Sequence, residues 1–180
     1  MNLPTKITVL RLFMVPPVVA LLAFSSPAAD LAAAIIFCAA SFSDWLDGYL
    51  ARSRKEVTAF GKILDPLADK LLVACTLIVL VGMDRAVSWI VAVIIGREIL
   101  ITGLRGMGAS QGHIIQAQIL GKLKMVFQVA AVLLLILNWN LYGLSFKQMG
   151  SVALWVVMVL SVISGYQYWV RFHSKMDADL

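Results

Sequence analysis

The sequence predicts an all-α integral membrane protein with six transmembrane helices and both termini on the cytoplasmic side. Of its 180 residues, 61% are hydrophobic and only 14% are charged, whereas a soluble domain has about 25% charged residues. The apolar residues form six runs, each near the ~20 residues that a helix needs to cross ~30 Å of hydrocarbon. The basic residues favour loops on one side of these runs, which predicts that this side is cytoplasmic.

The six runs cover residues 7–24, 31–50, 64–82, 87–104, 119–138 and 149–170. Helices are expected because the backbone N–H and C=O groups of an open strand would have no hydrogen-bond partner in lipid. The first run precedes "SSPAA" and is also compatible with a cleaved signal sequence, but Arg11 lies within it and five further runs follow. The length predicts one domain over residues 1–180. Cys38 and Cys75 lie in separate runs, which predicts neither a disulfide framework nor a zinc site.

The orientation follows from the basic residues. All but two of the 15 Lys and Arg residues fall on one predicted side, and the exceptions are Arg85 and Lys147. Some of the 13 lie within the runs, but the bias remains without them. Both termini and the loop between the second and third runs are therefore expected in the cytoplasm.

Four aspartates flank that loop, in "SDWLDGYLARSRKEVTAFGKILDPLADK" (residues 43–70). At 100° per residue, the span from Asp44 to Arg52 places five residues within an arc of roughly 140° on one helix: Asp44, Asp47, Gly48, Ala51 and Arg52. On the next helix, Gly61, Asp65 and Asp69 follow an i, i+4, i+8 spacing. Two carboxylates from each helix can converge, and an oxygen-only ligand set suits Mg²⁺ or Mn²⁺. The guanidinium of Arg52 offers a planar fork for a phosphate.

Simpler interpretations exist for single members of this group. Asp65 before Pro66 is typical of a helix N-cap followed by proline at the first helical position. Asp44 can pair with Arg52 or Lys55 near a helix end. Asp69 lies a turn inside an apolar run, where an ionisable residue usually has a function.

The pattern Asp44-x2-Asp47-Gly48-x2-Ala51-Arg52-x8-Gly61-x3-Asp65-x3-Asp69 resembles the signature of the CDP-alcohol phosphotransferase family at all eight positions. Members of that family are integral membrane enzymes with six transmembrane helices, usually homodimers. They transfer a substituted phosphate from a CDP-linked donor to an alcohol and release CMP. The resemblance implies that Asp44, Asp47 and Asp65 ligate two divalent metals, with Asp69 contributing and acting as the base. It also implies a site for the cytidine diphosphate at Gly48, Ala51, Arg52, Thr58 and Gly61.

Cations in the second half of the sequence lie on the same predicted side. In "GREILITGLRG", Arg97 and Arg105 share one helix face about 12 Å apart. Lys122 and Lys124 begin the fifth run, and Glu98 is the only acidic residue nearby. The excess of positive charge suggests a soluble anionic acceptor. Anchoring at the cytoplasmic face and snorkelling are the alternative, which accounts well for Lys124 and poorly for Arg97.

These segments and the opening "NLPTKITVLRLFMVPP" are similar to the bacterial phosphatidylglycerophosphate synthase branch of the family, except at Met125, where the branch often has threonine. The similarity implies CDP-diacylglycerol as the donor, with Thr8 in its site. It implies sn-glycerol 3-phosphate as the acceptor, held by Arg97, Arg105, Lys122 and Lys124. The protein would lie in the inner membrane with its active site facing the cytoplasm, and no nucleic-acid partner is expected.

Two other functions remain open at this point. The acceptor could instead be phosphatidylglycerol, serine or an inositol phosphate, although a bulky lipid acceptor does not need four cations. A divalent-cation transporter would need acidic residues along a path across the membrane, whereas only Asp30 and Asp84 lie on the opposite side.

Overall fold

The computed structural model describes residues 3–54, 59–110, 119–141 and 143–177. Within these ranges, side chains are not described for residues 3–7, 44–54, 59–66, 69, 109–110, 119–120, 122, 141 and 175–177. The described chain is almost entirely helical, as predicted. Its helices are α1 (Leu3–Ala23), α2 (Pro27–Arg54), α3 (Ala59–Gly82), α4 (Ser88–Ser110), α5 (Ile119–Leu137) and α6 (Phe146–Asp177).

A small antiparallel ribbon between α5 and α6 was not predicted. Its two strands, β1 (Asn140–Leu141) and β2 (Leu144–Ser145), pair Asn140 with Ser145. Gly143 directly precedes β2 with a φ of 81°. Glycine adopts this left-handed conformation without steric cost, which permits a tight reversal between the strands.

Each predicted apolar run falls on one helix, and every helix except α5 extends beyond its run at one end or both. The N-cap interpretation of Asp65 is wrong, because α3 already begins at Ala59 and Pro66 lies inside the helix. An interior proline removes one backbone hydrogen bond without necessarily ending a helix. Helix α1 likewise continues through Pro16 and Pro17.

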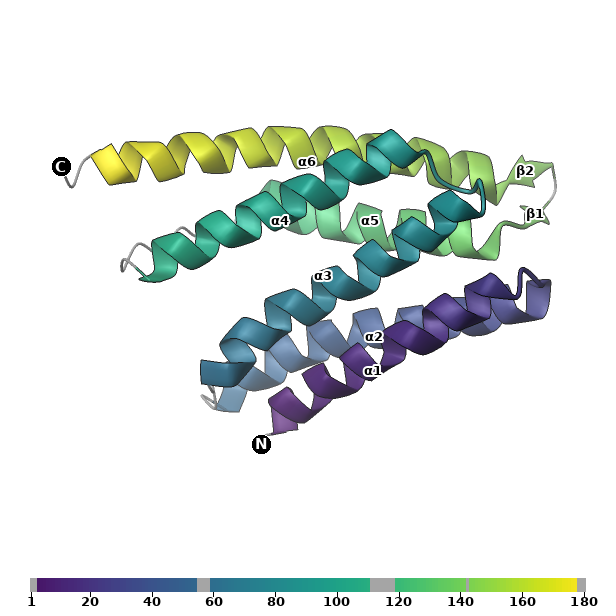
Figure 1. Cartoon of the computed structure of the whole chain (residues 1–180), viewed down its shortest axis with the longest axis horizontal. Coiled ribbons are helices and arrows are strands. Elements are labelled where there is room, and N and C mark those ends of the chain that lie inside the picture. The colour runs from purple at the N-terminus through teal and green to yellow at the C-terminus, as the bar shows by residue number, and fades with distance from the viewer. Residues whose placement is uncertain (1–2, 55–58, 111–118, 142, 178–180) are drawn as a thin grey trace.

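The helices run alternately in opposite directions, so that the chain passes repeatedly between the two ends of the bundle (Figure 1). One end, here called the terminal end, carries both chain termini, the end of α2, the start of α3, the end of α4 and the start of α5. The opposite end, here called the hairpin end, carries the α1–α2 and α3–α4 loops and the β1–β2 ribbon. The two termini thus share one end, as the predicted topology requires.

A continuous apolar core joins the helices. Helix α1 packs on α2 and α3, α6 packs on α4 and α5, and α2 packs on α5. Fully buried core side chains include Leu22, Phe37, Leu77, Leu135 and Leu154. Helices α5 and α6 approach closely at Gly150, where an added Cβ would lie 2.7 Å from the Leu135 Cγ atom.

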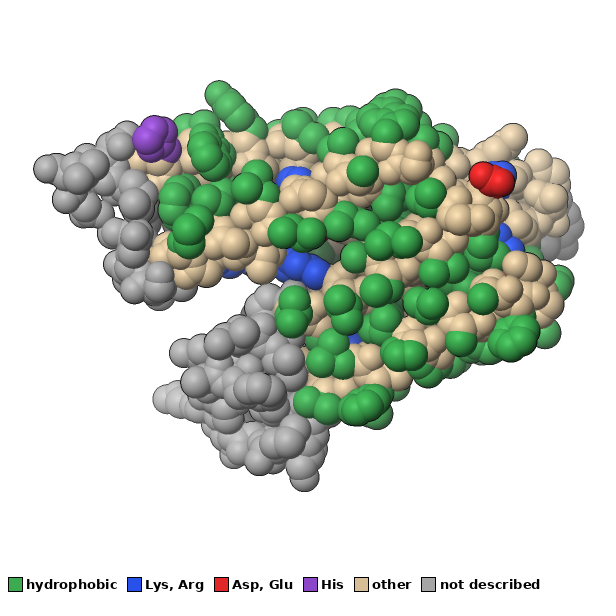
Figure 2. Space-filling view, in the orientation of Figure 1, with side chains coloured by type: hydrophobic (Ala, Val, Ile, Leu, Met, Phe, Trp, Pro, Cys, Tyr) green, Lys and Arg blue, Asp and Glu red, His purple; other side chains and the backbone are tan. Residues whose placement is uncertain are grey.

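The outer surface is also apolar, and Figure 2 shows hydrophobic side chains over much of the face that it presents. Phe13, Phe24 and Tyr166 are each at least 70% exposed. A soluble monomer rarely exposes so much contiguous apolar surface. The composition and this surface are those of a membrane protein.

In the described part of the chain, the stretch Phe146–Ser174 of α6 is long and apolar enough to cross a membrane. Shorter apolar stretches occupy four other helices: Thr8–Ala23, Pro27–Ser43, Lys70–Gly82 and Leu123–Leu137.

An ion pair closes the hairpin end. Arg85, in the α3–α4 loop, donates from Nη2 to Asp30 Oδ2 of α2 at 2.8 Å and from Nη1 to the Ile136 carbonyl of α5 at 2.8 Å. Both charged side chains are at most 10% exposed. Three segments distant in the sequence are therefore joined at this end of the bundle.

Candidate functional site

The terminal end brings together the segments that carry the predicted site. Asp44 and Asp47 lie in the second half of α2, and Asp65 and Asp69 lie in the first half of α3. Four residues separate the two helices, so their ends can lie no more than about 18 Å apart. Helix α3 is continuous over its aspartates, which is the condition that their i, i+4 spacing needs in order to share one face.

The donor chemistry at these helix ends fits a divalent metal. All four predicted metal ligands are aspartates, so the metal would be bound by oxygen atoms alone. Oxygen-only ligand sets suit hard cations. No group of three or more His, Cys, Asp or Glu side chains occurs among the described residues. The four aspartates fall outside the side chains covered by that statement, so their convergence stays a prediction.

The predicted cytidine-diphosphate residues fall in the same two segments. The backbone of Gly48, Ala51 and Arg52 is helical in α2, and that of Gly61 is helical in α3. Their side-chain environments, like that of Lys122 in α5, are not described, and Thr58 lies outside the described residues altogether. Their roles also stay predictions.

Helix α1 contacts α2 immediately beside the first aspartate. Thr8 is fully buried, and Arg11 is 1% exposed with its Nε atom 3.4 Å from Ser43 Oγ. The Ser43 hydroxyl donates to the Ala40 carbonyl at 2.7 Å, which leaves its oxygen to accept from Arg11. Arg11 was not among the predicted site residues, although an arginine inside an apolar run is the signal that points to it.

Arg97 of α4 is fixed against α6. Its Nε donates to the Ser161 carbonyl at 2.9 Å, and its Nη2 donates to Ser164 Oγ at 2.8 Å. Its Cγ and Nε atoms lie 3.2 Å from the position that a Cβ of Gly165 would occupy. The absence of a side chain at Gly165 therefore allows the arginine to lie directly on α6.

Lys124 of α5 is buried rather than snorkelling to the membrane surface. It is 3% exposed and forms an ion pair with Glu98 Oε1 of α4. The same carboxylate oxygen lies 3.9 Å from Arg97 Nη1. Glu98 therefore links the cations of α4 and α5, and the chain of contacts continues through Arg97 to α6.

Arg105 lies two helical turns beyond Arg97, towards the terminal end. It is exposed, and its guanidinium carbon lies 5.8 Å from the centroid of the Tyr168 ring of α6. An arginine over an aromatic face is a favourable cation–π arrangement. Figure 2 shows Lys and Arg side chains in the hollow between α3 and α4. Of the described cations, Arg97 and Arg105 thus contact α6, and Lys124 of α5 contacts α4.

The α6 residues that contact these cations were missed by the sequence analysis. Ser161, Ser164, Gly165 and Tyr168 follow an i, i+3, i+4, i+7 pattern, which places them on one helix face. The pattern is visible in the sequence, but nothing in it identifies α4 as the neighbour. Only the packing of α6 on α4 reveals the connection.

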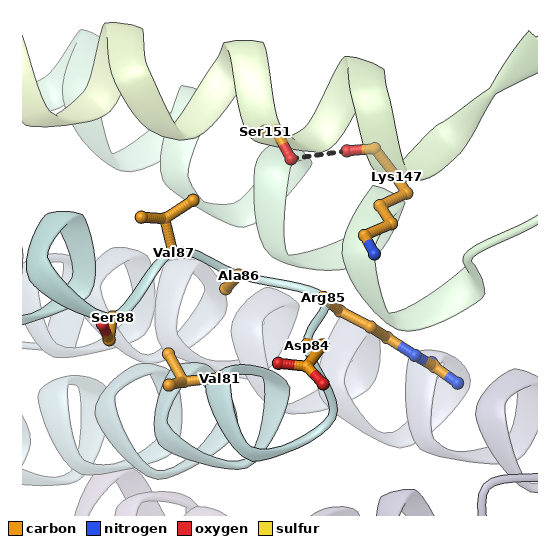
Figure 3. Close-up of a pocket in the computed structure, with 8 residues that line it drawn as sticks. All are labelled: Val81, Asp84, Arg85, Ala86, Val87, Ser88, Lys147 and Ser151. Atoms are coloured by element: carbon orange, nitrogen blue, oxygen red, sulfur yellow. Dashed lines mark hydrogen bonds between the residues drawn. The ribbon is translucent and has the colours of Figure 1, made fainter.

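A groove of about 350 Å³ lies at the hairpin end, away from the predicted site. It is lined by the end of α3, the α3–α4 loop, and Lys147 and Ser151 of α6. Figure 3 shows the Lys147 side chain extending over the groove, with the Ser151 hydroxyl donating to the Lys147 carbonyl at 2.8 Å. Two acidic residues lie at this end: Asp84 lines the groove, and Asp30 is paired with Arg85. An aspartate already paired with an arginine does not favour a path for cations through the bundle.

Comparisons with known proteins show the family to which the chain belongs. Residues 1–163 match the family model described as CDP-alcohol phosphatidyltransferase. A Bacillus subtilis (strain 168) protein named CDP-diacylglycerol--glycerol-3-phosphate 3-phosphatidyltransferase is 44% identical over 94% of each chain. Proteins with the same name from Rickettsia typhi and Pseudomonas fluorescens are 36% and 37% identical, covering 93% and 88% of this chain and 94% and 87% of their own. The family resemblance of the eight-residue pattern is confirmed, and the chain belongs to the CDP-alcohol phosphatidyltransferase family.

Proposed function

We propose that this protein transfers the phosphatidyl group of CDP-diacylglycerol to sn-glycerol 3-phosphate, giving phosphatidylglycerol phosphate and CMP. The observation that carries this assignment is the similarity to relatives named for this reaction, which extends over more than nine tenths of the chain at up to 44% identity. The grouping of cationic segments with the aspartate-bearing segments at the terminal end supports an anionic acceptor.

The donor site is assigned to the α2–α3 segment and the facing part of α1. Arg52 binds the diphosphate through its guanidinium fork. The small residues Gly48 and Ala51 let the cytidine diphosphate approach the backbone closely, with Thr58 and Gly61 nearby in the same site. Thr8 completes the donor site from α1, where it is buried. The acyl chains stay in the bilayer while the head group enters the site from the cytoplasm.

The reaction itself is assigned to the carboxylates. Asp44, Asp47, Asp65 and Asp69 would hold two divalent ions, Mg²⁺ or Mn²⁺. Such ions neutralise the diphosphate and stabilise the CMP leaving group when bound. Asp69 accepts the proton of the acceptor's 1-hydroxyl as that oxygen bonds to the phosphatidyl phosphorus and the bond to CMP breaks.

The phosphate of the acceptor is assigned to Arg97, Arg105, Lys122 and Lys124. Arg105 is the exposed member among those whose side chains are described, so it is the best placed to meet a soluble ligand. Arg97 and Lys124 lie deeper and already have protein partners. They meet the bound phosphate from beneath with the N–H groups that these partners leave over, and they add positive potential there.

The membrane arrangement follows from the same residues. All six helices cross the inner membrane, with the terminal end and both termini in the cytoplasm. The positions of the two exceptions to the charge bias, Arg85 and Lys147, support this orientation, because both lie at the hairpin end. The protein functions in the bilayer as a homodimer.

Site-directed variants test the assignment of the metal ligands. Asp44→Asn and Asp65→Asn are expected to abolish CMP release from CDP-diacylglycerol. Treatment of the wild type with EDTA should also abolish it. Added Mg²⁺ or Mn²⁺ should restore CMP release in the EDTA-treated wild type but not in the two variants. Asp84→Asn is the matched control, because it changes an aspartate at the hairpin end. Undiminished CMP release in metal-free buffer would contradict the assignment.

A further inference from the structure

Helix α6 presents one face to the cations of α4. Its residues Ser161, Ser164, Gly165 and Tyr168 lie on this face, opposite Arg97 and Arg105. In both helices the contacting residues recur at helical spacing, seven positions apart in α6 and eight in α4. We call these four residues the α6 stripe.

The stripe fixes the guanidinium of Arg97 at two of its nitrogen atoms. Ser164 Oγ accepts from Nη2 at 2.8 Å, and its own hydroxyl hydrogen is directed to the Leu160 carbonyl at 2.6 Å. A hydroxyl oxygen already bound in this way presents its lone pairs in a defined direction. Since Nε is also bound to the Ser161 carbonyl at 2.9 Å, rotation about the last side-chain bonds of Arg97 would break at least one of the two hydrogen bonds.

Tyr168 holds the second arginine. Its ring is 6% exposed and packs with Ile101 and Leu104 of α4, and Phe172 packs against the same cluster. The guanidinium of Arg105 lies over this ring at 5.8 Å. The ring is therefore held by its neighbours, and it supplies a fixed surface on which an otherwise exposed arginine can rest.

We propose that Ser164 and Tyr168 are positioning residues for acceptor binding, which hold Arg97 and Arg105 in the orientation that receives the phosphate of the acceptor. This inference rests on the proposed function, in which these two arginines bind that phosphate. A free arginine side chain loses much of its rotamer freedom when it binds a ligand. An arginine that is already held by α6 loses less, so its contribution to acceptor affinity is greater.

Saturation curves for glycerol 3-phosphate, measured by CMP release from the purified full-length protein in detergent, test the proposal. Ser164→Ala is expected to raise the acceptor KM about five- to tenfold, which is within the range for the loss of one ordinary hydrogen bond, because Ser164 acts on the acceptor only through Arg97. The KM for CDP-diacylglycerol should stay within about twofold. Ser164→Thr retains the hydroxyl and should keep the acceptor KM near that of the wild type. Ser151→Ala is the matched control, because it removes a similar hydroxyl-to-carbonyl hydrogen bond from the hairpin end of the same helix.

A second pair of variants tests the ring independently. Tyr168→Phe retains the aromatic face and should leave the acceptor KM near that of the wild type. Tyr168→Leu removes the face and should raise the acceptor KM about three- to fivefold, in keeping with the strength of an exposed cation–π contact. A role in packing alone predicts instead that Ser164→Ala and Tyr168→Leu lower the thermal midpoint without changing the acceptor KM, and that result would overturn the proposal.

Arg105→Ala separates this inference from the function on which it rests. A raised acceptor KM in Arg105→Ala, with unchanged values in Ser164→Ala and Tyr168→Leu, overturns the positioning role and leaves the acceptor site intact. An unchanged acceptor KM in Arg105→Ala overturns the assignment of the acceptor site, and the positioning role with it.

Discussion

The ion pair between Glu98 and Lys124 allows the structural and functional roles of a buried cation to be separated. Lys124 is 3% exposed, and the side chain of Glu98 is 18% exposed. Removing one partner of a buried pair leaves the other charge without compensation, at a cost of about 3–5 kcal/mol. For a chain of 180 residues, 3 kcal/mol corresponds to a fall in Tm of roughly 6–12 °C.

The two single variants, Lys124→Met and Glu98→Gln, are expected to lose different amounts of stability. Lys124→Met keeps a long unbranched side chain and leaves Glu98 close to Arg97, 3.9 Å away. Glu98→Gln instead leaves Arg97 and Lys124 as neighbouring cations without their shared carboxylate, so it should be the more destabilising change. The double variant removes both members of the pair and should recover most of the lost stability.

Thermal unfolding in detergent and glycerol 3-phosphate saturation curves are measured on the same four proteins. If Lys124 also contributes to acceptor binding, the double variant regains stability while its acceptor KM remains raised. If Lys124 is only the partner of Glu98, stability and KM recover together. A double variant whose loss of stability equals the sum of the two single losses would show that the residues are not coupled, and it would refute the reasoning.

Four further variants have specific expected outcomes. Asp69→Asn should lower kcat for CMP release by roughly a hundredfold or more with the donor KM largely retained, and a near-normal kcat would assign the base to another residue. Arg85→Ala leaves the buried carboxylate of Asp30 unpaired and should lower the thermal midpoint while the folded protein keeps its kcat; an unchanged midpoint would contradict the role of this pair. Gly150→Ala places a Cβ 2.7 Å from a leucine side chain of α5 and should cost about 1–3 kcal/mol, whereas Gly103→Ala meets open space and should not destabilise.

The sequence predicted the number and order of the helices because a helix needs a run of about 20 apolar residues to cross a bilayer. Such runs can be recognised by their length alone, without any helical periodicity. It did not predict where the helices end. Polar residues beyond the apolar runs continue α2 to Arg54 and begin α3 at Ala59, since a helix does not stop where its hydrophobic residues stop. Pro66 was interpreted as the first helical residue because proline is common at that position. The sequence does not show that the helix already begins at Ala59.

The candidate site was predictable only in part. Charge and spacing identified Arg97 and Arg105 as members of one face of α4, but the α6 stripe is more than 50 residues away in the sequence. Hydroxyl groups and a tyrosine in an apolar helix do not specify their partners. The burial of Lys124 was also missed, because a lysine near the end of an apolar run is compatible with snorkelling until the position of Glu98 is known.

The central claim is tested most directly by a panel of acceptors. The purified protein is supplied with CDP-diacylglycerol and Mg²⁺, and CMP release is measured with one alcohol at a time: glycerol 3-phosphate, phosphatidylglycerol, serine or inositol phosphate. We predict rapid CMP release with glycerol 3-phosphate, formation of phosphatidylglycerol phosphate in equal amount, and only background release with the other three. Background release with glycerol 3-phosphate together with turnover of another alcohol would contradict the account.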